Sequence, residues 1–125
     1  MDQYGQLYAD ARLWLEKGWC DYLAPQLYWP ISPAKQSFPA LLDWWRSQSK
    51  SGRPVWPGIA TERIGSKRPA REMINQIALT RRNVPSGTQP GHIHWNMRAL
   101  MRNKGGVNNL LKAESYRDRA APPSR

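Results

Sequence analysis

Polar side chains suited to binding a small polar ligand lie at regular spacing in residues 18–29. These residues are expected to form a buried β-strand, along which side chains alternate between two faces. One face then carries Gln26 and Tyr28, and the other carries Leu23 and Leu27. An amide and a phenol opposite an apolar face predict a sheet whose second face lines a polar pocket.

A candidate carboxylate follows the second apolar stretch of the chain. Residues 54–61 are expected to form a short strand, and Glu62 comes directly after it. Small residues at Gly58 and Ala60 leave space in the middle of the sheet. Glu62 is therefore the candidate catalytic residue, and pairing with Arg63 or Arg81 at the surface is its alternative role.

A third apolar stretch, residues 91–96, adds imidazoles and an amide. Alternation places His92, His94 and Asn96 on the pocket face, while Trp95 faces away or turns over the mouth of the pocket. Two histidines on one strand face have a spacing that some metal sites use. Without a further ligand clearly facing them, the sequence predicts no metal site.

The combined set suits a carbohydrate, because flat apolar rings can stack on sugars and directional donors can bind hydroxyls. The expected substrate-binding residues are Gln26, Tyr28, Trp29, His94, Trp95 and Asn96. Hydrogen bonding to neighbouring strands is the alternative role of Gln26 and Tyr28. Glycoside hydrolysis commonly needs two carboxylates about 5–10 Å apart, and Glu62 has no evident second partner.

Composition limits the remaining functions. The chain has 125 residues, enough for one domain, and a net charge of +10 that comes entirely from residues 46–125, since residues 1–45 hold three basic and five acidic side chains. No nucleic-acid-binding signature accompanies the basic residues, so a solvated outer layer of helices is favoured over a nucleic-acid partner. Cys20 has no partner for an intramolecular disulfide, and a buried, unreactive thiol is expected.

The chain offers little sign of a membrane span, a signal peptide or a cofactor. No run of about 18 apolar residues occurs, which argues against a membrane-spanning helix. The first residues have neither the basic start nor the apolar core of a signal peptide. No glycine-rich phosphate loop follows any expected strand, and no cofactor is predicted.

The expected element order is a helix, then a strand and a helix three times over. A helix over residues 4–15 ends at Gly18, Ser37 caps a helix that stops near Gly52, and Pro69 opens the next helix. The buried stripe of this helix consists of Met73, Ile74, Ile77 and Ala78. A turn-rich loop follows over residues 83–90. A last helical stretch, broken at Gly105–Gly106, reaches about Ala113.

Alternating strands and helices predict an α/β fold with a parallel sheet. Two architectures satisfy this order: an open doubly wound sheet and part of a (β/α)₈ barrel. Polar and aromatic residues gather at the carboxyl ends of the expected strands, which is where barrel enzymes keep their sites. A complete barrel needs at least about 200 residues, so three βα units cannot close one.

Residues 14–29, WLEKGWCDYLAPQLYW, resemble the glycosyl hydrolase-like 10 family, whose members carry a W-x-x-x-G-x-x-D-Y-[IL]-x-P-Q-x-Y-W stretch. Weaker matches follow in the family's order: VWPGI at 55–59, EMINQI at 72–77 with Thr80-Arg81, and GHIHW at 91–95. The likeness extends from residue 3 to about residue 120.

The resemblance implies a (β/α)₈ (TIM) barrel that acts on, or derives from enzymes acting on, polysaccharides such as cell-wall glycan. Only the last three βα units match, so residues 1–113 would be the C-terminal part of that barrel and 114–125 an exit linker. The fragment alone would be inactive, and its parent would be exported or lipid-anchored in a bacterium. Glu62 lies close to the end of the seventh strand, where related barrels hold a nucleophile.

Two alternatives from other classes stay open. One is a small basic module that binds nucleic acid or another anionic polymer through its arginines and lysines. The other is a pseudoenzyme that binds sugar without cleaving it.

Overall fold

A computed structural model describes residues 3–32, 36–82, 84 and 86–119. Pro33 after the first expected strand, two positions of the expected loop (Asn83 and Pro85) and the tail residues 120–125 lie outside this description. None of the helices in the described ranges has the length and apolar character that crossing a bilayer requires.

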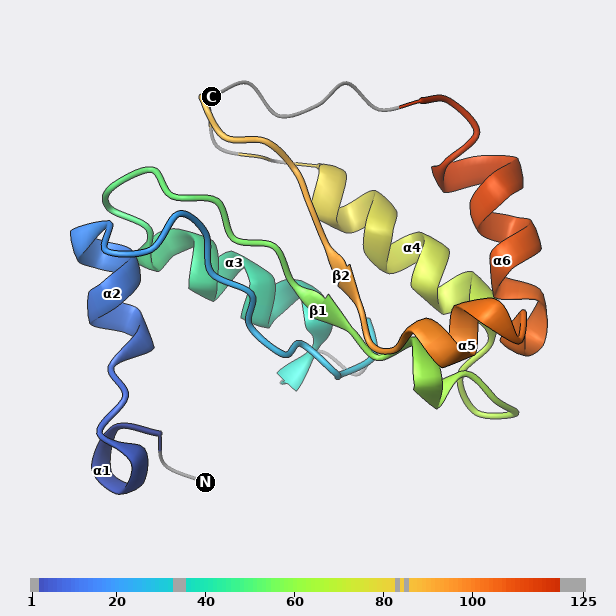
Figure 1. The fold of residues 1–125 in the computed structure, drawn as a ribbon, viewed down its shortest axis with the longest axis horizontal. Helices are drawn as coiled ribbons and strands as arrows, with labels where there is room; N and C mark the ends of the chain where they lie inside the picture. The colour runs from blue at the N-terminus through green and yellow to red at the C-terminus, as the bar shows by residue number, and fades with distance from the viewer. Residues whose placement is uncertain (1–2, 33–35, 83, 85, 120–125) are drawn as a thin grey trace.

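Two short parallel strands lie at the centre of the molecule (Figure 1). β1 (Gly58–Ile59) pairs with β2 (Ile93–His94), with Gly58 opposite Ile93 and Ile59 opposite His94. The first expected strand joins the other edge of β1 through isolated parallel bridges, Leu23 to Val55 and Gln26 to Gly58. The expected parallel order of three extended segments is therefore present.

The regular strands are much shorter than the expected ranges of 20–29, 54–61 and 91–96. Pro25 stands in the middle of the first segment, and Pro54 and Pro57 interrupt the second. Proline has no N–H to donate to a ladder, so only part of each segment forms strand hydrogen bonds. The remaining bonds still hold the segments side by side: Trp56 N–H donates to the Leu23 carbonyl, and Leu27 N–H to the Gly58 carbonyl.

The expected helix over residues 4–15 consists of two helices. α1 (Gln3–Leu7) ends before Tyr8, whose φ of 53° lies in the left-handed region, and α2 (Ala11–Lys17) begins after Asp10. The Asp10 side chain accepts the Leu13 N–H at 2.8 Å, which caps α2 and makes a new helix start favourable. At the other end of α2, Gly18 has a φ of 69°, as its expected capping position requires.

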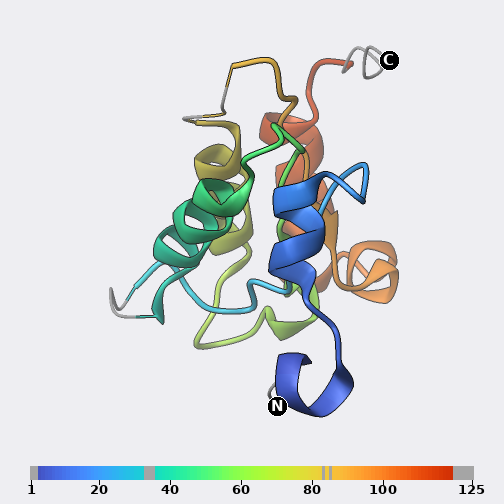
Figure 2. The same ribbon diagram turned by 90° about the vertical axis from the view of Figure 1, so that its left-hand side faces the viewer.

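α3 (Phe38–Gln48) and α4 (Ala70–Arg81) lie together on one side of the strands (Figure 2). Ser37 caps α3 through the Ala40 N–H, as expected, but α3 ends four residues before Gly52. Pro69 precedes the first turn of α4. The buried face of α4 includes Met73, Ile74 and Ile77, while Ala78 is only partly buried.

The C-terminal stretch is helical with the expected interruption. α5 (Met97–Met101) is followed by a 3₁₀ turn, η3 (Lys104–Gly106), then α6 (Val107–Leu110), which continues as a single π-type turn, η4 (Leu111–Ser115). Gly105 and Gly106 both have positive φ, at 57° and 79°. Two consecutive left-handed residues are favourable only for glycine, which explains why the helix breaks there.

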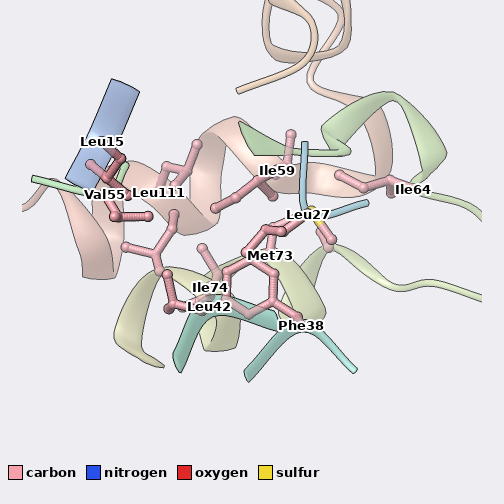
Figure 3. Packing of buried hydrophobic residues seen from close by; sticks show 13 residues of the cluster. Leu15, Leu27, Phe38, Leu42, Val55, Ile59, Ile64, Met73, Ile74 and Leu111 are labelled. Carbon is pink, nitrogen blue, oxygen red and sulfur yellow. The ribbon is translucent and has the colours of Figure 1, made fainter. Parts of the chain in front are cut away.

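One hydrophobic core lies between the strands and the helices (Figure 3). Phe38 and Leu42 of α3 meet Met73 and Ile77 of α4, and Ile59 of β1 reaches them from the sheet. All five side chains are at most 2% exposed. This core lies on one face of the sheet. On the opposite face Gly58 and Ala60 are buried, whereas Gln26, Ile93 and Trp95 are exposed and available to a ligand or a partner.

Candidate functional site

Glu62 and Asn96 meet at the carboxyl ends of β1 and β2. Glu62 lies in a 3₁₀ turn (η2, Thr61–Arg63) directly after the β1 segment, and its N–H donates to the Trp95 carbonyl at 2.9 Å. The Asn96 amide nitrogen donates to Glu62 Oε2 at 3.1 Å, while its oxygen accepts the Ala99 N–H and caps α5. The carboxylate is therefore held by one side chain that also fixes the start of a helix.

Tyr28 extends this cluster from the first segment. A Cβ atom at Gly58 would lie 3.4 Å from its ring, so the phenol lies directly against β1 at this glycine. Arg63 stacks over the ring at 5.6 Å, and Arg63 and Arg68 both donate to the Tyr28 carbonyl at 3.2 Å. Burial raises the pKa of the Tyr28 hydroxyl, and the negative charge of Glu62 raises it further.

Aromatic rings occupy the open face of the sheet. Tyr22 and Trp56 are stacked with ring centroids 4.4 Å apart, and the Trp56 indole N–H donates to the Gln89 carbonyl at 3.0 Å. Further along, Ile93 and Trp95 are 41% and 51% exposed. Flat rings beside a carboxylate and an amide form the kind of surface that a sugar can stack on.

The third strand faces the opposite way from the expected orientation. In a parallel pair, Ile93 lies beside Gly58 and shares its face, so Ile93 and Trp95 are on the open side. His94 is turned toward the helices, where its Nδ1 lies 2.7 Å from the Thr61 hydroxyl. The sequence did not predict this orientation, because both alternate sets of the strand, His92 with His94 and Ile93 with Trp95, contain an aromatic or imidazole ring.

Tyr116 joins the two histidines behind the sheet. Its hydroxyl lies 2.5 Å from His92 Nε2 and 2.9 Å from His94 Nε2. Burial lowers the pKa of both imidazoles, and that of His92 falls to about 4 with help from the charges of His94 and Arg81. Both imidazoles contact the Tyr116 hydroxyl behind the sheet, and a substrate contact of His94 remains a prediction.

The other expected substrate contacts are placed as follows. Gln26 is exposed on the open face beside Gly58, and no described residue is seen to hydrogen-bond its amide. Trp29 lies at the end of the first segment, with its ring 42% exposed and its carbonyl bound by the Gln76 amide at 3.0 Å. The substrate contacts of these two residues remain predictions.

Several basic residues lie beside the site that the sequence did not identify as site residues. An open pocket of about 440 Å³ at the carboxyl end of β1 brings Glu62 and Asn96 together with Arg98, Arg102 and Lys104. Lys104 also donates to the Glu62 carbonyl. These three residues follow Glu62 by 36 to 42 positions in the chain, so the sequence alone does not indicate that they lie beside it.

The site as described holds one carboxylate. Elsewhere Glu72 accepts the Ile31 N–H, and Glu114 pairs with Arg71. No group of three or more histidine, cysteine or acidic side chains in the described ranges could hold a metal ion. The arrangement can therefore bind a hydroxylated ligand, and it can supply a single acid, base or nucleophile.

Parallel extended segments with helices on one face, and a carboxylate, an amide and aromatic rings at their carboxyl ends, define an α/β protein with a polar, ring-lined site. The sequence model of the family described as glycosyl hydrolase-like 10 matches residues 2–74. The chain belongs to this family.

Two relatives are similar to the chain. It is 32% identical to Glycosyl hydrolase YngK of Bacillus subtilis (strain 168) over 127 aligned positions, which cover 96% of the chain and 24% of the relative. It is 41% identical to Glycosyl hydrolase DigH of Escherichia coli (strain K12) over 63 positions, which cover 50% of the chain and 14% of the relative. The chain thus spans at most about a quarter of these relatives.

Proposed function

We propose that this chain is the C-terminal part of a glycoside-hydrolase-like (β/α)₈ barrel, and that its full-length parent hydrolyses glycosidic bonds of a polysaccharide. The single observation that carries the proposal is the Glu62–Asn96 pair at the carboxyl ends of parallel strands, next to the exposed ring of Trp95. Barrel enzymes hold their reactive groups at this end. The names of both relatives support a glycoside as the substrate.

In this proposal the open face of the sheet is the inner wall of the barrel. Trp95 and Tyr28 flank the sugar nearest to Glu62, at the carboxyl ends of the segments. The stacked pair of Tyr22 and Trp56 lies toward the amino ends and packs inside the barrel. Asn96 orients the Glu62 carboxylate through its amide N–H. Glu62 then acts as nucleophile or base, and the required second carboxylate comes from the part of the barrel outside these 125 residues.

Sugar binding can be tested on the chain itself. Cellohexaose and chitohexaose are titrated against it, with tryptophan fluorescence and NMR shifts of the indole N–H groups as signals. Trp95→Ala should weaken binding about tenfold, because stacking on an exposed ring supplies much of the contact. Trp44→Ala is the matched control, since Trp44 is 48% exposed on α3. If the chain binds neither of these hexasaccharides nor hexagalacturonate, or if both variants lose affinity equally, the proposal fails.

Hydrolysis requires a separate measurement. The chain alone should release no reducing ends from either hexasaccharide, and the full-length parent should. In the parent, Glu62→Gln should lower kcat by at least about a hundredfold, which is the usual loss of one acid–base group. Unchanged kcat in this variant, with sugar binding intact, would support the alternative of a sugar-binding protein whose Glu62 is not catalytic.

A further inference from the structure

The pocket beside Glu62 has a strong excess of positive charge. Its lining includes three cations, Arg98, Arg102 and Lys104, against the single carboxylate of Glu62. That carboxylate already accepts a hydrogen bond from Asn96. The pocket is therefore positive even with Glu62 ionised.

Two of these cations lie on the same side of the helical segment that lines the pocket. Arg98 lies in α5, and Arg102 follows its last residue with its backbone N–H bound to the Arg98 carbonyl. The two side chains, four residues apart, therefore project to the same side. Both are exposed. Lys104 follows in the next turn, where its ammonium group is anchored to the Glu62 carbonyl.

Within the described part of the chain, no ion pair neutralises this charge. The ion pairs found within the described ranges join Arg71 to Glu114 and neighbouring Arg117 to Asp118. Neither pair involves the pocket. A neutral glycan would leave two guanidinium groups without an anionic partner at the edge of the binding site.

We propose that this pocket binds an anionic substituent, a carboxylate or an ester sulfate or phosphate, on the sugar next to Glu62. Guanidinium groups present paired N–H donors that match the oxygen atoms of such groups. The substrate is then an acidic polysaccharide, and Arg98 and Arg102 are the residues that select it. This inference rests on the proposed function, because it assumes that a glycan lies at Glu62.

The test compares hexasaccharides of equal length and different charge. Cellohexaose, hexagalacturonate and sulfated cellohexaose are titrated against the chain at one fixed ionic strength. The double variant Arg98→Gln/Arg102→Gln should bind the acidic sugars about tenfold more weakly, since two charge-assisted contacts are lost. Its affinity for cellohexaose should change less than about twofold. Weakening for hexagalacturonate alone would identify a carboxylate, and weakening for the sulfated sugar an ester.

A control variant with the same loss of charge distinguishes binding at this pocket from general electrostatic attraction of acidic sugars to the protein. Arg12→Gln/Arg82→Gln removes the same charge from exposed positions on α2 and at the end of α4. Equal weakening in both double variants would overturn the proposal, and so would acidic sugars that bind no more tightly than cellohexaose. Single-stranded DNA that binds as tightly as hexagalacturonate and depends on Arg98 and Arg102 would overturn it in favour of nucleic acid. If cellohexaose still binds in these cases, the proposed function stands without the inference.

Discussion

At the scale of single residues, Asn96 has two separable roles. Its amide nitrogen holds Glu62, and its oxygen caps α5 through the Ala99 N–H. Asparagine is well suited to this position, because it offers a donor and an acceptor on one short side chain. Alanine removes both contacts, whereas serine can still cap a helix but cannot span the distance to Glu62.

We therefore expect Asn96→Ala to lower the free energy of unfolding by about 1 kcal/mol, the usual value of a helix cap. Asn96→Ser should stay within about 0.5 kcal/mol of the original chain. Both variants should bind cellohexaose more weakly, because Glu62 loses its orienting partner. Urea unfolding and the sugar titration measure the two effects. Equal loss of stability in both variants would show that capping is not what Asn96 contributes.

A second residue-scale prediction concerns Gly91. A Cβ atom there would lie 2.7 Å from the Trp56 indole, so Gly91→Ala must displace that ring. Tryptophan fluorescence should shift, and stability should fall by about 1–3 kcal/mol, as is typical of overpacking. Gly65→Ala is the control, because a Cβ atom there meets nothing within 4 Å. An unshifted spectrum for Gly91→Ala would mean that Trp56 does not pack as described.

At the scale of elements, a partly buried carboxylate and a buried amide of α4 fix how the first extended segment docks on this helix. Glu72 of α4 accepts the Ile31 N–H at 2.7 Å, and Gln76 binds the Trp29 carbonyl. Together they hold the exit of the first segment against α4. Glu72→Ala should cost about 1–3 kcal/mol, because it leaves a partly buried N–H unpaired. Asn75→Ala, on the exposed side of the same helix, should cost less than about 0.5 kcal/mol in the same urea experiment.

The C-terminal helical segment docks through titratable groups, so its docking should depend on pH. The pKa of folded His92 is about 4, below the ordinary value of 6.5. Between these two values the His92 imidazole is protonated in the unfolded chain and neutral in the folded chain. The contribution of His92 to stability is thus full above about pH 6.5 and declines as the pH falls toward 4. Burial of His94 acts in the same direction.

Urea midpoints measured from pH 7 to pH 4.5 should therefore decrease, and the decrease should be smaller in His92→Gln. Acidic side chains titrate in the original chain and the variant alike, so the difference between the two curves isolates His92. Parallel curves would contradict the pKa assignment. Histidine ring NMR signals followed over the same range provide an independent check.

The elements also show what the sequence could and could not predict. Helix caps at Gly18 and Ser37, the buried stripe of α4 and the break at Gly105 depend on local chemistry, and all were predicted. The facing of β2 was not, because it depends on its register with Gly58. Tyr116 could not be connected to the histidines either, since it lies more than twenty residues after them in the chain.

At the scale of the whole molecule, one face of the sheet leaves several large apolar side chains exposed within the described part of the chain. Helices α3 and α4 lie on the other side (Figure 2), and the open face exposes Tyr22, Ile93 and Trp95. The two outer segments pair only inward, each with the segment that contains β1. Open edges and exposed rings of this kind commonly associate with other chains. In the proposed barrel, both would be covered by the remaining strands.

The isolated chain should therefore self-associate as its concentration rises. Sedimentation velocity should show a monomer when dilute and larger species when concentrated, and Ile93→Thr should shift this equilibrium toward the monomer. Leu7→Thr removes a comparably exposed apolar side chain, 56% against 41%, from α1 rather than from the sheet, and should change little. A chain that stays monomeric at all concentrations and unfolds cooperatively would count against the proposed barrel, because the open face would then need no missing partner.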